Sequence, residues 1–195
     1  MPSSIKAIIG LANPGSEYAE TRHNAGAWFV EELSRRNNQP LRPEKKFLGE
    51  YAKVHLGGQD IHLLIPTTFM NRSGQAVAAL ARFYKLAPEE ILVAHDELDI
   101  APGEIRFKKS GGHGGHNGLR DIISALGNQR DFYRLRVGIG HPGDAAKVVN
   151  YVLGTPGKSD RIAIDNAIDA ALDDLPLALN GEWNKAMSHL HSLHF

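Results

Sequence analysis

Most of the side chains that could do chemistry lie in four short polar segments, and amides and imidazoles dominate them. The chain has no cysteine and no G-x-S-x-G sequence, so a cysteine nucleophile and a serine elbow are excluded. The remaining hydrolytic route is attack by water, with a histidine as general base. The segments contain Asn13, Tyr18, Arg22, His23 and Asn24; Thr67, Thr68, Phe69, Met70 and Asn71; His95, Asp96, Glu97 and Asp99; and His113, His116 and Asn117.

A histidine base works best when an aspartate accepts a hydrogen bond from its far ring nitrogen and stabilises the imidazolium. Asparagine amides can donate to a developing oxyanion and accept from a substrate N–H. Simpler roles remain open: His23 could lie at the surface, Asn13 could serve a turn, and Asn117 could cap the helix that follows it. His95 is expected to face away from Asp96, because neighbours on a strand point to opposite sides.

The segment from Gly111 to Gly118 holds five glycines in eight residues. It does not match a nucleotide-binding P-loop, and it favours close approach of backbone to a substrate or an RNA. Together with His95, the histidines His113 and His116 could instead bind a metal, so a metal-dependent hydrolase is an alternative. A chelator distinguishes the two hypotheses, because only the metal-dependent enzyme would lose activity. A second group, His189, His191 and His194, is expected to lie on a frayed end.

Length and composition indicate an ordinary globular protein. The chain has 195 residues, 42% hydrophobic and 23% charged, which suits a single domain. Its 22 basic and 22 acidic side chains cancel, which excludes a generally basic coat protein and an acidic disordered chain. No apolar run is long enough to span a membrane and residues 1–6 lack a signal-peptide pattern, so we expect a cytoplasmic protein.

The charge is unevenly distributed along the chain. Residues 103–136 hold seven basic and three acidic side chains, a net charge of +4, whereas residues 155–195 hold three basic and six acidic ones, a net charge of −3. A local basic zone could steer a polyanion to one face, although an ordinary solvated surface is the alternative.

The hydrophobic pattern predicts alternating strands and helices. Strands are expected at 6–11, 50–56, 59–65, 91–94, 105–108 and 133–139, with a hairpin turn at Gly57-Gly58. Helices are expected at 25–36, from a cap at Ser73 to about 86, at 119–126, and from about Ala145, Ser159 and Leu177. This order predicts a single α/β domain of residues 1–195, in which helices flank both faces of a twisted, mixed and mostly parallel sheet. A C-terminal helical segment, residues 145–195, is expected to pack on this domain. Ligands bind at the carboxyl ends of such strands, so the loops after Leu11, Ile65, Ala94 and Lys108 are expected to converge there.

Five motifs, in order over residues 5–143, resemble those of the bacterial peptidyl-tRNA hydrolase family. The first runs from Ile9 to Gly15 and continues through Tyr18 to Thr21-Arg22-His23-Asn24-Ala25-Gly26. The others are Pro66 to Gly74, His95 to Asp99, Gly111 to Leu119, and Arg134 to Gly140. Ala12 stands where many members have Gly, and Ile65 where many have Lys.

The resemblance implies hydrolysis of the ester between a peptide and the 3′ ribose of tRNA, which recycles tRNA from peptides released by the ribosome. It implies a monomer that needs no metal or other cofactor, has no membrane or obligate protein partner, and recognises the acceptor stem and 3′ CCA end. His23 matches the catalytic histidine and Asp96 its partner. Seven residues match substrate-binding positions of the family: Asn13, Tyr18, Phe69, Met70, Asn71, His116 and Asn117. Lys108 and Arg136 match basic residues that hold the 5′ phosphate of the tRNA. A non-catalytic RNA-binding module is a third reading, which the His23 and Asp96 pair argues against.

Overall fold

The computed structural model describes residues 5–195, so most of the segment used for the signal-peptide argument lies outside the described residues. The strands form a single sheet in the order β2-β3-β4-β1-β5-β7-β6. The central strands β4, β1, β5 and β7 run parallel, and β2, β3 and β6 run antiparallel to their neighbours. The strands are β1 (Ala7–Gly10), β2 (Arg42–Glu44), β3 (Gly49–Leu56), β4 (Gln59–Pro66), β5 (Ile91–Glu97), β6 (Ile105–Lys109) and β7 (Tyr133–Gly138).

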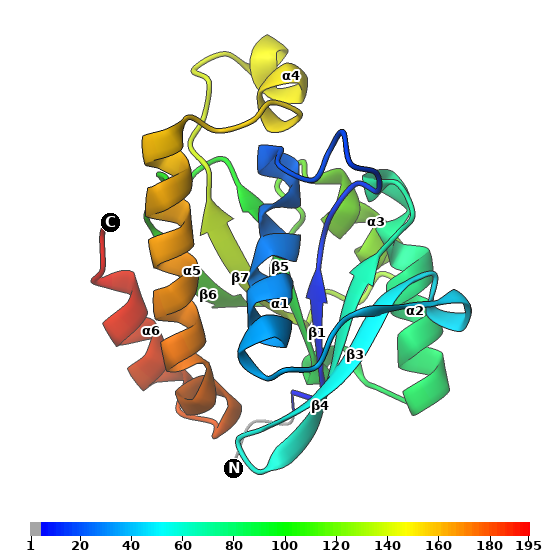
Figure 1. Cartoon of the computed structure of the whole chain (residues 1–195). Coiled ribbons are helices and arrows are strands. Elements are labelled where there is room, and N and C mark those ends of the chain that lie inside the picture. The colour runs from blue at the N-terminus through cyan, green and yellow to red at the C-terminus, as the bar shows by residue number, and fades with distance from the viewer. Residues whose placement is uncertain (1–4) are drawn as a thin grey trace.

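Helices cover both faces of the sheet, which confirms the predicted fold class (Figure 1). One face packs against α1 and α5, with α6 beside them, and the other packs against α2 and α3. The short helix α4 stands at the end of the molecule where the parallel strands finish (Figure 1). The helices are α1 (Ala25–Arg36), α2 (Ser73–Tyr84), α3 (Asn117–Ala125), α4 (Val148–Val152), α5 (Lys158–Leu179) and α6 (Trp183–His191).

The central strand β1 shows why the sheet needs helices on both sides. All its residues are buried; Ile8 packs into the core under α1 and α5, and Ala7 and Ile9 pack into the core under α2. An apolar run without alternation is the sequence pattern of a strand covered on both faces. β1 therefore holds the middle of the sheet, and its carboxyl end opens directly into the first polar loop.

Helix α1 lies unusually close to β5, and this closeness positions the residues before it. A Cβ atom on Gly26 would come within 2.2 Å of the carbonyl oxygen of Ala94, so only glycine fits there. The single 3₁₀ turn Arg22–Asn24 precedes α1 directly. Its histidine, His23, is thereby brought to the carboxyl end of β5.

Three details of the predicted helices were wrong. Ser73 does not cap α2, because it is the first helical residue and its hydroxyl donates to the Met70 carbonyl at 2.7 Å. The last helix begins at Trp183 rather than at Leu177, which lies near the end of α5. The helix expected from Ala145 is a 3₁₀ turn followed by the five-residue α4.

The C-terminal histidines were expected on a frayed end, and the structure contradicts this. His189 binds the buried carboxylate of Asp174 at 2.6 Å, and His194 pairs with Glu104. The Nε2 atom of His191 accepts the Phe107 N–H of the edge strand β6 at 3.1 Å. Since an edge strand leaves N–H groups without strand partners, the C-terminal helix satisfies one of them here.

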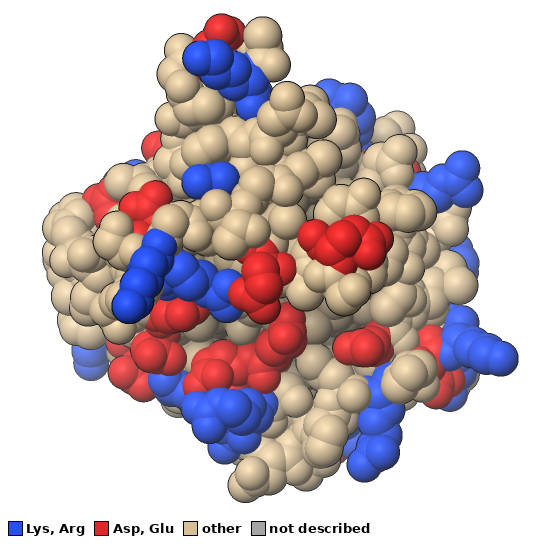
Figure 2. All heavy atoms as spheres, turned by 45° about the horizontal axis from the view of Figure 1, so that its top comes forward, with Lys and Arg blue, Asp and Glu red and all other residues tan. Residues whose placement is uncertain are grey.

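Figure 2 shows that acidic and basic side chains lie next to one another on the face that carries α1 and α5. Arg36 of α1 binds Asp169 and Asp173 of α5, each at 3.1 Å. Arg161 of α5 binds Glu20 at 2.7 Å and stacks over the Trp28 ring at 3.5 Å. Part of the negative charge of the C-terminal segment is therefore neutralised by contact with the rest of the domain.

Candidate active site

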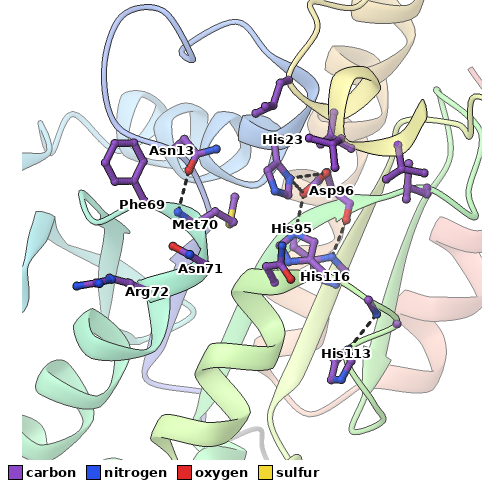
Figure 3. A pocket seen from close by; sticks show the side chains of 18 of the residues that line it. Asn13, His23, Phe69, Met70, Asn71, Arg72, His95, Asp96, His113 and His116 are labelled. Atoms are coloured by element: carbon purple, nitrogen blue, oxygen red, sulfur yellow. Dashed lines mark hydrogen bonds and ion pairs between the residues drawn. The ribbon is translucent and has the colours of Figure 1, made fainter. Parts of the chain in front are cut away.

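A cavity of about 1090 Å³ opens at the carboxyl ends of β1, β4 and β5 (Figure 3). One wall is polar, one is the apolar side of α4, and no serine or cysteine is among the described residues that line it. The loops after Leu11, Ile65 and Ala94 meet here, as predicted. The lining residues are Asn13, His23, Thr67, Thr68, Phe69, Met70, Asn71, Arg72, Gln75, His95, Asp96, Glu97, Leu98, His113, Gly114, Gly115, His116, Asn117, Ala145, Val148, Val149, Val152 and Leu153.

The fourth loop reaches the cavity by a different route from the one expected. β6 is antiparallel to β7, so its carboxyl end at Lys109 pairs with Tyr133, at the start of β7. The glycine-rich segment therefore travels back along the sheet before it delivers His113, His116 and Asn117 to the cavity. The prediction that Lys108 ends its strand at the same edge as the other loops was wrong.

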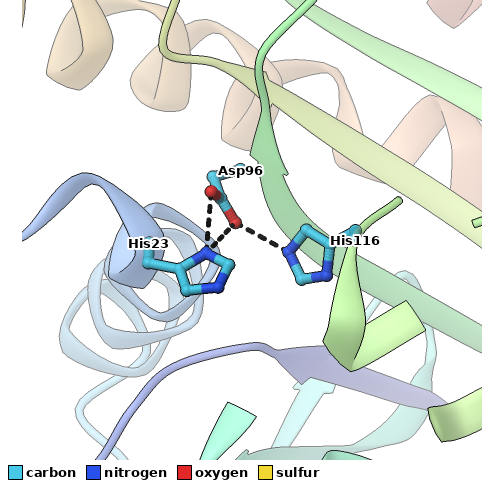
Figure 4. A group of neighbouring side chains, drawn as sticks. All are labelled: His23, Asp96 and His116. Carbon is cyan, nitrogen blue, oxygen red and sulfur yellow. Dashed lines mark hydrogen bonds and ion pairs between the residues drawn. The ribbon is translucent and has the colours of Figure 1, made fainter. Parts of the chain in front are cut away.

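His23 and Asp96 form a hydrogen-bonded pair on the floor of the cavity (Figure 4). Nδ1 of His23 lies 2.9 and 3.0 Å from the two carboxylate oxygens of Asp96. Burial disfavours the charged form of His23, but the charge and hydrogen bond of Asp96 outweigh it and raise the pKa of His23. Because Nδ1 is engaged, Nε2 is the free nitrogen, and it points away from the carboxylate (Figure 4).

Asp96 is itself buried, with 4% of its surface exposed, and it has a second imidazole partner. Nε2 of His116 lies 2.8 Å from Oδ1 of Asp96. Burial would raise the pKa of this carboxyl, but its interactions with His23 and His116, including a hydrogen bond from each, lower it well below its usual range. Asp96 is therefore an anion with two N–H donors, which is how a buried carboxylate is normally compensated.

His23, Asp96 and His116 offer ligand atoms within 4.8 Å of one another, a spacing that could admit a metal. The hydrogen bonds argue against that use. Nδ1 of His116 accepts the N–H groups of Gly118 and Leu119 at 3.1 and 3.3 Å, so the ring proton sits on Nε2, the atom a metal would need. The three side chains therefore form a hydrogen-bonded network centred on the Asp96 carboxylate.

The histidine group that the sequence suggested as a metal site does not assemble as such. Nδ1 of His95 donates to the Asp96 carbonyl at 2.8 Å, and Nδ1 of His113 accepts the Gly115 N–H at 2.9 Å. His95 was expected to face away from the site, but its ring packs edge-on against His116 and lines the cavity. Burial, first of all, lowers the pKa of His95 to about 3, so this ring is neutral.

Asn13 is held by its neighbours in a way that leaves its amide nitrogen available. Its side-chain oxygen accepts the Met70 N–H at 2.8 Å (Figure 3), which ties the first polar loop to the second. Its backbone N–H donates to Oδ1 of Asn24, and Nδ2 of Asn24 donates back to its carbonyl, at 2.9 and 3.0 Å. Sequence reasoning placed Asn24 in the first polar segment and the first motif but gave it no specific role.

The other residues matched to substrate positions fall into two groups. Phe69 is 59% exposed and, with Met70, Asn71 and Asn117, lines the cavity. Tyr18 is not among the described lining residues; it lies half-buried in the loop before His23. The helix cap expected of Asn117 is made by its neighbour His116.

Lys108 and Arg136 lie outside the cavity, on the paired strands β6 and β7. Strand register places Lys108 opposite Arg134 and Arg106 opposite Arg136, so the four basic side chains share one face of the sheet. Nε of Arg136 binds Glu97, a residue of the cavity rim, at 3.0 Å. The basic zone seen in the sequence therefore includes a patch next to the cavity.

The described lining of the cleft holds a buried carboxylate that orients an imidazole, several asparagine amides and no serine or cysteine, which is an arrangement suited to a hydrolase that uses water as its nucleophile. The model of the family described as peptidyl-tRNA hydrolase matches residues 7–194. A peptidyl-tRNA hydrolase of Chromohalobacter salexigens is 66% identical over 97% of this chain and 98% of its own, and one of Yersinia pseudotuberculosis is 60% identical over 97% of each. A crystal structure of peptidyl-tRNA hydrolase from Acinetobacter baumannii superposes with a TM-score of 0.95 at 48% identity, covering 100% of this chain and 98% of that one.

The chain therefore belongs to the peptidyl-tRNA hydrolase family, and its activity is the hydrolysis of peptidyl-tRNA. The fold and the function inferred from the five motifs are confirmed. The described residues include no helix long and apolar enough to cross a membrane.

Proposed function

We propose that His23 is the general base that activates water against the ester between the peptide and the 3′ ribose of tRNA, with Asp96 as its partner. The observation that supports this is the pair itself: Asp96 occupies Nδ1 and leaves Nε2 of His23 free at the cavity floor. Nε2 takes a proton from water while the water oxygen bonds to the carbonyl carbon. The tetrahedral intermediate then breaks its bond to the ribose oxygen, which takes the proton back from His23. The products are the peptide acid and tRNA with a free hydroxyl, and no cofactor enters the balance.

The asparagines are proposed to bind the parts of the substrate that do not change with peptide sequence. Asn71 donates to the oxyanion of the intermediate, a contribution typically worth about 10²–10³-fold. Asn13, whose oxygen is held by Met70, uses its free amide nitrogen on the peptide backbone, and Asn117 binds the terminal nucleotide. Amides recognise any peptide backbone, which suits substrates with variable side chains. Phe69, Met70, His116 and Tyr18 contribute contacts near the 3′ end.

The acceptor stem is proposed to lie along the basic face of β6 and β7. Lys108 and Arg136 hold its 5′-terminal phosphate, Lys108 as a point charge and Arg136 through its planar fork. A few such contacts give modest affinity that falls with salt. The chain acts as one domain of residues 1–195 and as a cytoplasmic monomer.

Hydrolysis of an N-acetyl-aminoacyl-tRNA, compared with the free-amine form and run with and without EDTA, tests the proposal. His23→Ala should lower kcat by about 10²–10⁴-fold with tRNA binding largely retained. The exposed His55, at the far hairpin, supplies the matched control His55→Ala, which should keep full activity. Full activity in His23→Ala would remove this residue from the mechanism, and loss of wild-type activity in EDTA would indicate a metal-dependent reaction.

A further inference from the structure

His116 links the start of helix α3 to the carboxylate that holds His23. Its side chain is 9% exposed and makes three hydrogen bonds. Nδ1 accepts the N–H groups of Gly118 and Leu119 in the first turn of α3, at 3.1 and 3.3 Å, and Nε2 lies 2.8 Å from Oδ1 of Asp96. The His116 and His23 rings lie 5.0 Å apart, with Asp96 bonded to both (Figure 4).

These bonds fix the tautomer of His116. A nitrogen that accepts N–H groups carries no proton, so the single N–H of the neutral ring is on Nε2 and is donated to Asp96. His116 is therefore an N–H donor with a fixed direction, because its hydrogen bonds to the first turn of α3 hold the ring in place.

We propose that His116 is a positioning residue that moderates how tightly Asp96 holds the protonated form of His23. Its N–H takes up part of the charge on Oδ1 and fixes the carboxylate plane toward His23. An anion that has a second donor attracts an imidazolium less strongly than an anion with only one. His23 can then release its proton to the ribose oxygen as readily as it takes one from water.

Several other titratable and charged groups surround the pair, but among the described residues only His23 and His116 bond to the Asp96 carboxylate. The neutral ring of His95 lies next to the His116 ring, with 5.2 Å between the two centroids. Nδ1 of His95 donates to the carbonyl oxygen of Asp96. Arg136 is paired with Glu97, and Arg134 donates to the carbonyl of Gly111. The titratable and charged groups around His23 and His116 are Arg22 on the turn before α1, His95, Asp96 and Glu97 on β5, Arg72 across the cavity, His113 in the glycine-rich segment, Arg134 and Arg136 on β7, and Tyr151 on α4.

His116→Asn separates the two functions of this side chain. Asparagine is among the best helix caps, so its oxygen can accept from the first turn of α3, while its short amide no longer donates to Asp96. The acidic limb of kcat/KM against pH should then move up by about one pH unit, because more of the Asp96 charge is left to hold the protonated His23, and a change of this size lies within what a hydrogen bond to a charged group is worth. The rate at the alkaline plateau should stay within about tenfold of wild type.

Two other outcomes would overturn the inference. One is a raised KM with an unmoved acidic limb, which would leave His116 with only the substrate contact proposed above. The other is a lower plateau with an unmoved limb, which would make it a structural residue. His113→Asn is the matched control: His113 lines the same cavity and accepts one backbone N–H, but it has no bond to Asp96, so its acidic limb should coincide with that of wild type.

The inference rests on His23 being the base, so it also needs a measurement that does not depend on turnover. NMR titration of the His23 imidazole in the free protein provides one, and the His116→Asn variant should titrate about one pH unit above wild type. An unmoved titration overturns the inference even if the variant is inactive. Failure of the proposed function would appear separately, as full activity in His23→Ala.

Discussion

Replacement of Asp96 by asparagine tests the central pair with almost no change in shape. In wild type the carboxylate faces the imidazolium that forms when His23 takes a proton, with 2.9 Å between the bonded atoms. Two unit charges about 4 Å apart at an effective dielectric constant of about 20 interact by about 4 kcal/mol. At about 1.4 kcal/mol for each factor of ten, Asp96→Asn should lower kcat by about 10³-fold.

The asparagine also creates a hydrogen-bond mismatch. Asp96 accepts from both His23 and His116, whereas an asparagine has one accepting oxygen and would turn its NH₂ group toward one of the two N–H donors. The loss should therefore appear in kcat, measured from initial rates with N-acetyl-aminoacyl-tRNA, with only a small change in KM. Asp60→Asn, which alters an exposed aspartate paired with His55 at the far hairpin, should keep wild-type rates. A folded Asp96→Asn protein that lost less than tenfold in kcat would refute the assigned role of the pair.

Three further outcomes are expected. Because the pKa of His23 is raised, the base stays protonated to higher pH, so the acidic limb of kcat/KM should lie above the ordinary histidine value of about 6.5; a limb below that value would contradict the electrostatics of the site. Lys108→Ala and Arg136→Ala should raise KM for tRNA substrates and each reduce the slope of log KM against log salt by about one, and unchanged slopes in both would exclude the proposed phosphate contacts. Gly26→Ala should destabilise the protein by about 1–3 kcal/mol in denaturant unfolding and lower kcat, because its Cβ would overlap a β5 carbonyl oxygen; Gly157→Ala, with open space around it, is the control, and equal stability of the two would disprove the close-packing argument.

The pair His23 and Asp96 could be predicted mainly through the resemblance to the family, because the local signals placed each residue beside an expected helix or strand but left simpler roles open. Asp96 ends an apolar run typical of a buried parallel strand, and His23 precedes an amphipathic helix that must pack on the same sheet. Chemistry narrowed the choice further, since the chain has no cysteine and no serine elbow. The five motifs then joined segments that are 73 residues apart in the sequence but in contact in the fold.

The parts that sequence reasoning missed depend on tertiary geometry. The direction of β6 is set by its pairing with β7, and a short strand has no pattern that distinguishes parallel from antiparallel. His116 caps α3 in place of Asn117 because the strand-to-helix loop places its ring, rather than the amide, over the first turn. His95 faces the site because α3 brings His116 up to its side of the strand, which alternation along β5 could not indicate.

The close packing of α1 on β5 and the hydrogen bonds of Asp96 depend on each other. If residue 26 carried a side chain, the turn that holds His23 would stand farther from β5. The Asp96 carboxylate would then lose one of its two donors. The charge of His23 is the main interaction that offsets burial and lowers the pKa of Asp96, so at a greater distance His23 would lose the anion that stabilises its imidazolium. The lowered pKa of Asp96 favours the folded state above the pH at which the unfolded aspartate titrates, and this stabilisation fades as pH falls toward the native value. The packing that stabilises the fold at neutral pH is thus the same packing that keeps the carboxylate charged for catalysis.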